Sequence, residues 1–233
     1  MITYLKLPAG NYKLIEVSAP NGYLKDKDGL KFTIGNDTHY SYTTYGAFIT
    51  VTYKNTPIKG QLEIKKTGEN LVIKDGKYTY KDKKLSGVTF EIYAEEDIKS
   101  ADGNHLYYEK GTKVDTITTD KNGYAISKKL PLGKYYLIEV KTQDEYVLDS
   151  NKHYFELKEN GEITKAEMKD KPITGTLEFT KTDVSTGEPL PNTLIEIYNE
   201  KDELIFSGRT DENGKITIPE IRYGKYYILE KEA

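Results

Sequence analysis

The chain of 233 residues contains no cysteine and no tryptophan. Without cysteine it cannot form disulfides, which are the usual covalent reinforcement of small extracellular β-domains. Lysine and arginine (34) nearly balance aspartate and glutamate (37), and the two signs are interspersed, which excludes a basic footprint for nucleic acid. No apolar run is long enough to span a bilayer, and no signal peptide opens the sequence. If the protein is exported, its targeting and anchoring segments are expected outside this sequence.

Tyrosine is abundant instead, with 21 residues. Runs rich in Val, Ile, Thr, Tyr and Phe are bounded by Gly, Asn, Asp and Pro, a pattern typical of short β-strands. The dipeptides Asp75-Gly76, Asn122-Gly123 and Asn213-Gly214 each predict a hairpin turn. No segment carries a sustained helical period with caps. The sequence therefore predicts an all-β protein built from antiparallel, Ig-like β-sandwiches.

Internal repeats divide the chain. The segment that begins at Gly60 recurs at Gly175, 115 residues later, and Asn55 and Asp170 are separated by the same interval. A domain of this size is ordinary for a β-fold. We therefore expect one complete domain over 58–172, preceded by the C-terminal part of a similar domain (1–57) and followed by the N-terminal part of another (173–233). These stretches are called the first, middle and third units below.

Charged residues recur on the apolar face of the expected strands. Side chains two residues apart in a strand share a face. By this parity Lys66 lies with Leu62 and Ile64, whereas Glu139 lies with Tyr135 and Leu137. The same parity places further candidates on apolar faces, namely Glu16, Asn55, Asp170, Lys181 and Glu230.

An amine, a carboxylic acid and an Asp or Asn carbonyl on facing strands of one apolar core have a reaction available. Burial disfavours the charged forms, so a neutral Lys66 amine could act as a nucleophile. A protonated Glu139 could polarise the Asp170 carbonyl and shuttle protons as water leaves. The product would be an intramolecular isopeptide bond between Lys66 and Asp170. It would reinforce the fold without cysteine.

The segment Tyr12–Tyr23 resembles the Tyr-x-Leu-x-Glu-x-x-Ala-Pro-x-Gly-Tyr E-box of the Cna protein B-type (CnaB, SpaA-like) domains of Gram-positive surface proteins and pilins. The resemblance covers essentially the whole chain. It implies a prealbumin-like sandwich with Lys66, Glu139 and Asp170 as the reacting residues and Glu139 as the catalyst. It also implies half-sites in the flanking units, where Glu16 and Asn55 lack a lysine, and Lys181 and Glu230 lack an acceptor. The middle E-box departs from the pattern after Val140, where Thr142-Gln143 replaces Ala-Pro.

The resemblance implies a structural stalk in an extracellular, cell-wall-anchored adhesin or pilus-associated protein. Its partners would be neighbouring repeats, with host matrix or cell-surface ligands reached through other domains. An alternative is a ligand-binding module that uses the 95–112 insertion, and the Tyr40–Tyr53 stretch could also stack a ligand. An enzyme acting on an external substrate ranks last. An ordinary buried ion-pair network remains the rival interpretation of the three residues. We expect no cofactor, and the three scattered histidines suggest no metal site.

Overall fold

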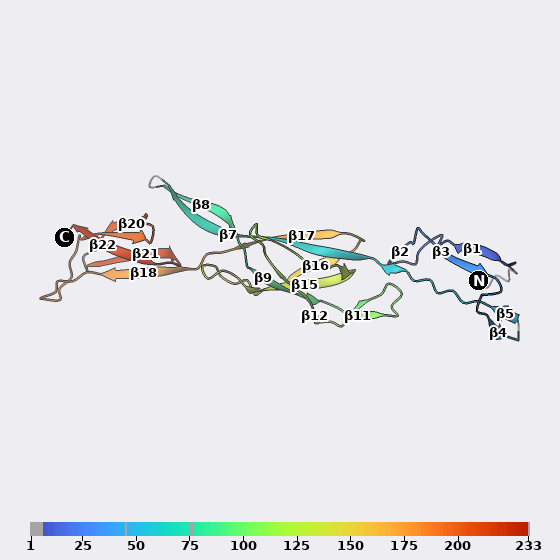
Figure 1. The fold of residues 1–233 in the computed structure, drawn as a ribbon. Coiled ribbons are helices and arrows are strands. Elements are labelled where there is room, and N and C mark those ends of the chain that lie inside the picture. The colour runs from blue at the N-terminus through green and yellow to red at the C-terminus, as the bar shows by residue number, and fades with distance from the viewer. Residues whose placement is uncertain (1–6, 45, 75–76, 233) are drawn as a thin grey trace.

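The computed structural model describes residues 7–44, 46–74 and 77–232. These residues form strands joined by turns and loops, and the described part contains no helix. The strands are arranged in an elongated row in Figure 1, with the N-terminal strands at one end and the C-terminal strands at the other. Among the described residues, no helix is long and apolar enough to cross a membrane.

The middle unit is a sandwich of two sheets. The first sheet is built around β7, which pairs with every other strand of that sheet, and the second has the order β12-β9-β15-β16. The strands of the first sheet are β7 (Lys59–Lys74), β8 (Lys77–Lys84), β13 (Tyr124–Ile126), β14 (Leu130–Pro131) and β17 (Ile163–Asp170). Those of the second are β9 (Thr89–Ala94), β12 (Lys113–Thr118), β15 (Gly133–Lys141) and β16 (His153–Leu157), and a small hairpin joins β10 (Ile98–Lys99) to β11 (Leu106–Tyr108).

Alternation along the strands builds the core between these sheets. Leu62 and Ile64 of β7 are fully buried and face Phe90 of β9 and Leu137 of β15 across the core cluster. The intervening side chains of β7 are only partly buried. The predicted sandwich, with apolar positions two residues apart directed inward, is therefore confirmed.

One strand pair differs from the prediction of purely antiparallel sheets. Strands β7 and β17 run parallel, with Met168 opposite Lys66 and Asp170 opposite Gly68. Parallel neighbours cannot be joined by a tight turn, but here the rest of the unit provides a long connection. This pairing makes the first and last strands of the unit immediate neighbours.

The flanking units contain smaller sheets. In the third unit, β18 (Thr174–Thr180) pairs with β21 (Lys215–Arg222), and β19 (Leu194–Asn199) lies between β20 (Leu204–Arg209) and β22 (Tyr226–Glu232). Ile195, Ile197 and Ile218 form its buried cluster. In residues 7–44 and 46–57, the described part of the first unit, there are three strand pairs: β1 (Gly10–Leu14) with β3 (Leu30–Ile34), β2 (Tyr23–Leu24) with β6 (Thr56–Pro57), and β4 (Ser41–Thr43) with β5 (Gly46–Phe48).

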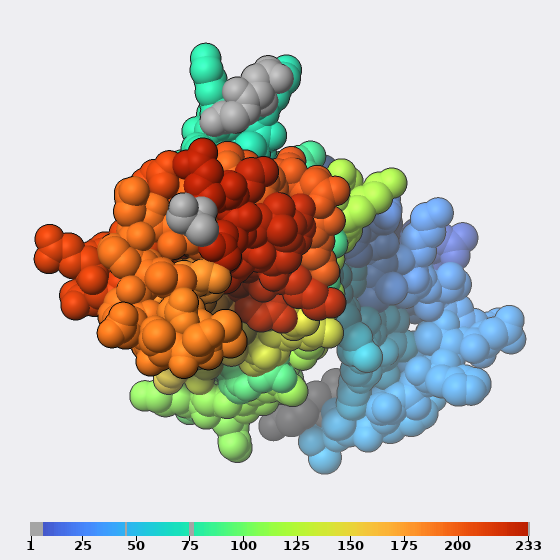
Figure 2. Space-filling model, turned by 90° about the vertical axis from the view of Figure 1, so that its left-hand side faces the viewer, coloured from blue at the N-terminus to red at the C-terminus, as the bar shows by residue number. Residues whose placement is uncertain are grey.

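Of the three predicted hairpins, one forms and two do not. Lys74 lies opposite Lys77, so β7 and β8 do form a hairpin, although Asp75 and Gly76 themselves lie outside the described residues. The β7–β8 ribbon protrudes beyond the rest of the outline in Figure 2. The hairpin expected at Asn122-Gly123 is wrong, because that turn leads from β12 in one sheet to β13 in the other. The turn at Asn213-Gly214 likewise connects β20 and β21, which belong to different sheets.

Candidate functional site

The three predicted residues of the middle unit meet in its core. Lys66 lies on β7 and Asp170 on the neighbouring β17, whereas Glu139 reaches in from β15 of the opposite sheet. The sequence placed Lys66 and Asp170 on facing strands. The parallel pairing instead places them side by side in one sheet, with the carboxyl group of Glu139 across the sandwich from both.

The contacts within this triad are direct. Lys66 Nζ lies 2.5 Å from Glu139 Oε2 and forms an ion pair and hydrogen bond with Asp170 Oδ1. Lys66 and Glu139 are each 1% exposed and Asp170 is 2% exposed. The ammonium group also lies 5.6 Å from the centre of the Phe90 ring. Amine and carbon electrophile are thus held together away from water, which is the arrangement that condensation requires.

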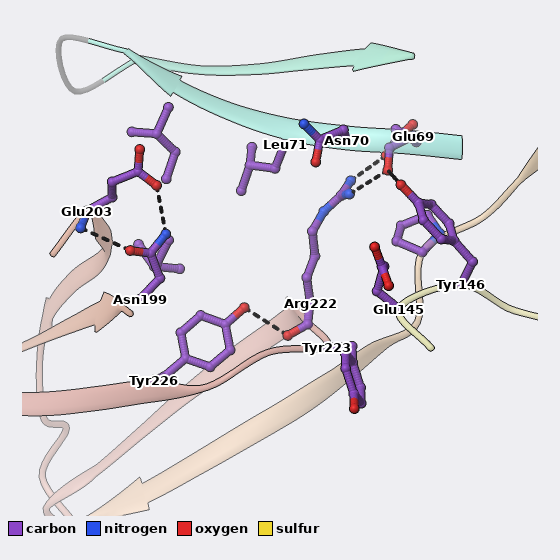
Figure 3. Close-up of a pocket in the computed structure, with 13 residues that line it drawn as sticks. Glu69, Asn70, Leu71, Glu145, Tyr146, Asn199, Glu203, Arg222, Tyr223 and Tyr226 are labelled. Atoms are coloured by element: carbon purple, nitrogen blue, oxygen red, sulfur yellow. Dashed lines mark hydrogen bonds and ion pairs between the residues drawn. The ribbon is translucent and has the colours of Figure 1, made fainter. Parts of the chain in front are cut away.

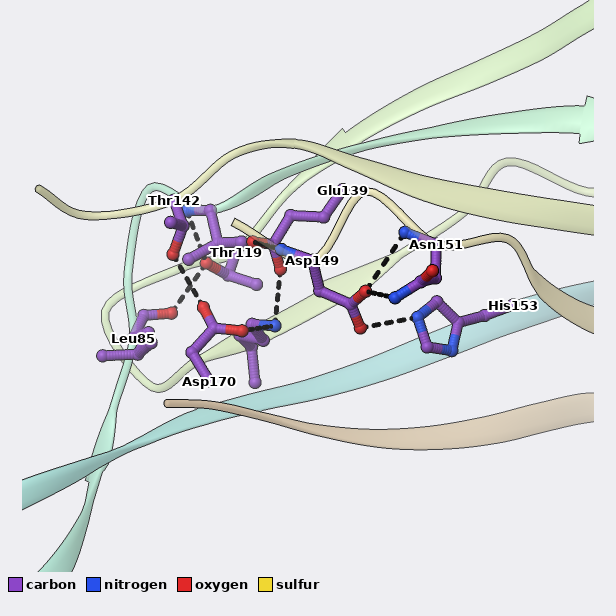
Figure 4. A network of polar contacts seen from close by, with 10 residues as sticks. Leu85, Thr119, Glu139, Thr142, Asp149, Asn151, His153 and Asp170 are labelled. Carbon is purple, nitrogen blue, oxygen red and sulfur yellow. Dashed lines mark hydrogen bonds and ion pairs between the residues drawn. The ribbon is translucent and has the colours of Figure 1, made fainter. Parts of the chain in front are cut away.

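Burial raises the pKa of Glu139, because desolvation penalises the carboxylate more than the charge and hydrogen bond of Lys66 favour it. The nearby charge of Asp170 acts in the same direction as burial. The Asp149 amide donates to Glu139 Oε1 at 3.4 Å, as Figure 4 shows. A carboxyl group that holds its proton in this position can act as a general acid.

Two backbone hydrogen bonds fix the strand at Lys66. Its amide donates to the Gly123 carbonyl at 2.7 Å, and its carbonyl accepts from the Leu85 amide at 3.2 Å. Gly123 has a φ of 76°, and a Cβ there would lie 2.5 Å from the Lys66 carbonyl oxygen. Glycine is therefore required at this close approach. The third unit repeats the arrangement, with the Lys181 amide donating to Gly214 at 2.8 Å.

The flanking units hold the predicted half-sites. In the first unit, Asn55 Nδ2 donates to Glu16 Oε1 at 2.6 Å. In the third, Lys181 Nζ lies 2.7 Å from Glu230 Oε2, and both side chains are partly exposed. Among the described residues no lysine completes the Glu16–Asn55 pair, and no acceptor residue completes the Lys181–Glu230 pair.

The strand expected to carry Asn55 on its apolar face is wrong. Residues 49–55 form no strand, and Val51 is exposed, although Tyr53 and Asn55 are half-buried. In the middle unit the equivalent strand β17 is held by pairing with β7. The described residues offer 49–55 no such partner strand, so the ladder that would enforce its alternation is missing.

The degenerate E-box of the middle unit makes specific contacts that sequence reasoning missed. The Thr142 hydroxyl donates to Asp170 Oδ2 at 2.7 Å, and Gln143 Nε2 donates to the Ser86 carbonyl at 2.9 Å. The available signal was a hydrogen-bonding residue at a motif position that is alanine in the first unit. The final tyrosine of the motif keeps its place, because Tyr146 bridges Pro172 just as Tyr23 pairs with Pro57.

The proposed ligand-binding insertion does not form an open aromatic surface. Tyr107 and Tyr108 are partly buried and pack against the core of the middle unit. A small pocket between the insertion and the first unit is lined by residues that include Gly22, Pro57 and Tyr107. No group of three or more His, Asp or Glu side chains in the described part of the chain is placed to hold a metal ion.

Comparison with known proteins identifies the family. The model of the SpaA family, described as a prealbumin-like fold domain, matches residues 1–48, 60–172 and 175–233. The chain belongs to the SpaA prealbumin-like fold domain family. The resemblance inferred from the E-box is thereby confirmed, and so is the prealbumin-like fold class. No curated protein matches the sequence.

Several solved structures also match the chain. The Bacillus anthracis TIE protein is 33% identical with a TM-score of 0.67, and the match covers 97% of this SpaA-family chain but 37% of that protein. The Streptococcal ancillary pilin is 18% identical, with a TM-score of 0.38 over 97% of this chain and 67% of that one. The major pilin subunit of Bacillus cereus is 15% identical, with a TM-score of 0.33 over 75% and 88%.

Proposed function

We propose that the chain is a run of stalk or spacer units of a Gram-positive cell-wall-anchored surface protein, an adhesin or a pilus-associated protein. In this proposal 58–172 is a complete SpaA-type domain, 1–57 the end of one and 173–233 the beginning of another. The protein acts outside the cell, and its immediate partners are neighbouring repeats. The observation that carries the proposal is the buried contact of Lys66 with Glu139 and Asp170, which links the first and last strands of one unit in an elongated row.

The chemistry proposed for this site is the formation of one isopeptide bond in each molecule. The Lys66 amine attacks Asp170 Cγ and forms the C–N bond, while Glu139 donates a proton to the carboxyl oxygen and removes one from the attacking nitrogen. Collapse of the tetrahedral intermediate breaks one C–O bond, and that oxygen leaves as water. Glu139 recovers its original protonation state, but the protein itself is consumed as the substrate. The chain is therefore not an enzyme in the sense of turning over an external substrate.

Intact-mass spectrometry of the purified chain tests this reaction. We expect a mass lower than that of the sequence by one water, and a branched peptide joining Lys66 to Asp170 after digestion. Only one loss is expected, because each flanking unit lacks one reacting group. A full, unreduced mass would refute the bond and leave an ordinary buried ion-pair network as the explanation.

Two variants separate the bond from the fold. Lys66→Ala removes the nucleophile, and Glu139→Gln keeps the side-chain shape but removes the proton shuttle. Both are expected to fold and to keep the full mass of their sequences. A fully cross-linked Glu139→Gln chain would exclude Glu139 from the mechanism, even if the bond itself were present.

A further inference from the structure

The two carboxyl oxygens of Asp170 lie in different surroundings. Oδ1 contacts Lys66 Nζ, and the same nitrogen contacts Glu139 Oε2. Oδ2 accepts a hydrogen bond from the Thr142 hydroxyl at 2.7 Å. Figure 4 shows this hydroxyl and the carboxyl group of Asp170 directed at one another. Thr142 directly follows the end of β15, three residues after Glu139, so one short segment of chain brings both side chains to the Lys66–Asp170 pair.

The acceptor side chain of the first unit has different surroundings. Three residues after Glu16 stands Ala19, which has no hydroxyl group, and the acceptor is Asn55. The Asn55 amide nitrogen already donates to Glu16, which distinguishes it from the amide oxygen. A carboxyl group has no such built-in asymmetry, because its two oxygens exchange by rotation about Cβ–Cγ. An external donor is needed to define which oxygen stays and which one leaves.

We propose that Thr142 is a catalytic residue of the isopeptide reaction, which donates a hydrogen bond to Asp170 Oδ2 as negative charge develops on that oxygen. This inference rests on the proposed function of the triad. The Thr142 hydroxyl selects Oδ2 as the oxygen retained in the amide and leaves Oδ1 for protonation by Glu139.

The reaction balances with these assignments. Transfer of one proton from the Lys66 ammonium group to Asp170 Oδ1 first converts the ion pair into an amine and a carboxylic acid. The Nζ–Cγ bond then forms as the electrons of the C=O bond move to Oδ2. One amine proton passes through Glu139 to Oδ1, and the Cγ–Oδ1 bond breaks to release water. The carbonyl re-forms at Oδ2, and Nζ keeps one hydrogen in the amide. Thr142 keeps its proton throughout and supplies only the hydrogen bond.

A donor aimed at a developing oxyanion has a large effect on rate. Removal of one such donor slows acyl-transfer enzymes by about 10²-fold or more. Thr142→Val removes the hydroxyl with little change in shape, so we expect bond formation in the full chain to slow by about 10²-fold. Thr142→Ser retains the donor and is expected to restore a rate close to that of the parent.

The rate is measured by synthesising each full chain in a cell-free system, quenching samples in denaturant over time, and following the loss of one water by intact mass. Thr142→Val that links as fast as the parent would overturn the proposal, and so would Thr142→Ser that links as slowly as Thr142→Val. A parent chain that never loses water would instead overturn the proposed function, and the role of Thr142 with it. The parent measurement therefore distinguishes the two failures.

Matched chains that also carry Lys66→Met report on folding alone, because they cannot form the bond. Linking is timed at a temperature below the melting transitions of these chains, so that slow linking cannot reflect an unfolded site. If Thr142→Val with Lys66→Met does not fold at any accessible temperature, Thr142 is structural and the catalytic assignment fails. If it folds and linking is still slow, the hydroxyl acts on the reaction.

Discussion

At the scale of single residues, Glu139 shows how the core changes the acidity of a side chain. A carboxyl group among apolar side chains is costly when it is charged, and burial raises the pKa of Glu139 for this reason. Lys66 opposes that shift through its hydrogen bond and its charge. The net result is that Glu139 binds its proton more tightly than an exposed glutamate does. Any change that removes Lys66 should therefore raise the pKa of Glu139 further.

This balance predicts that the unfolding free energy of the Lys66→Met chain depends on pH. That chain has no isopeptide bond, and Lys66 no longer places a cation beside Glu139. The folded-state pKa of Glu139 then lies above its ordinary value of 4.5, so the folded state binds its proton more tightly than the unfolded state does. The stability from this group is present below pH 4.5 and is lost as pH rises through the folded-state pKa. Each tenfold difference in proton affinity between the two states corresponds to about 1.4 kcal/mol. Urea unfolding at a series of pH values measures the loss.

The matched control carries Glu139→Gln in addition to Lys66→Met. Glutamine does not titrate, so the difference in unfolding free energy between the two chains isolates Glu139 from other acids, including Asp170. As pH increases, we expect the unfolding free energy of the chain that keeps Glu139 to fall relative to that of the control. A difference that does not change with pH would show that burial leaves the Glu139 pKa unaltered.

At the scale of elements, β7 has two roles along its length. Its first half carries Lys66 in the core, and its second half continues with β8 as a hairpin that reaches the third unit. Arg222 of β21 donates to the Glu69 carbonyl and to the Glu69 carboxylate, at 3.1 and 2.5 Å, as Figure 3 shows. The same guanidinium group lies 5.1 Å from the centre of the Tyr80 ring. The hairpin thus connects the middle and third units.

We expect Arg222→Ala to loosen this joint, at a cost of about 1 kcal/mol for a partly exposed ion pair and cation–π contact. The chain has no cysteine, so spin labels can be attached at only the two positions Lys158→Cys and Glu212→Cys, one in each unit. The distance distribution between the labels should broaden in the Arg222→Ala chain.

Arg209→Ala provides the control for that measurement. Arg209 donates to the Asn192 carbonyl and pairs with Glu232, so its contacts stay within the third unit. Its removal is expected to leave the distance distribution unchanged. Equal broadening in both variants would mean that Arg222 has no special role in the joint.

At the scale of the whole molecule, the units lie in a row, so tension applied to the two ends passes through each unit in turn. In the middle unit this path enters along β7 and leaves along β17, which are parallel neighbours. The proposed bond joins these strands directly at Lys66 and Asp170, 104 residues apart in sequence. Tension would then bypass the intervening residues, which suits the stalk role proposed above.

Single-molecule stretching tests this consequence. In the Lys66→Ala chain, unfolding of the middle unit should release the segment between residues 66 and 170 and lengthen the chain by roughly 350 Å, at about 3.4 Å per residue. In the parent chain that step should be missing. A parent molecule that shows the full extension would contradict a covalent link between the two strands.

The sequence by itself determined the β-class, the repeat interval and the inward direction of Lys66, Glu139 and Asp170. These properties are local, because strand parity depends only on the residue's position within its own strand. Repetition added the remaining evidence, since each motif in the middle unit could be compared with a second copy. Asp75-Gly76 likewise predicted its hairpin correctly, because the strands on either side of that turn pair with each other.

Only the tertiary structure decided which strands became neighbours. The parallel pairing of β7 with β17 and the sheet crossing at Asn122-Gly123 depend on contacts between residues far apart in sequence, which turn chemistry does not encode. The same reason explains why residues 49–55 form no strand and why Thr142 was seen only as a departure from a motif. Its hydroxyl gains a role when the fold places Asp170 within hydrogen-bonding distance.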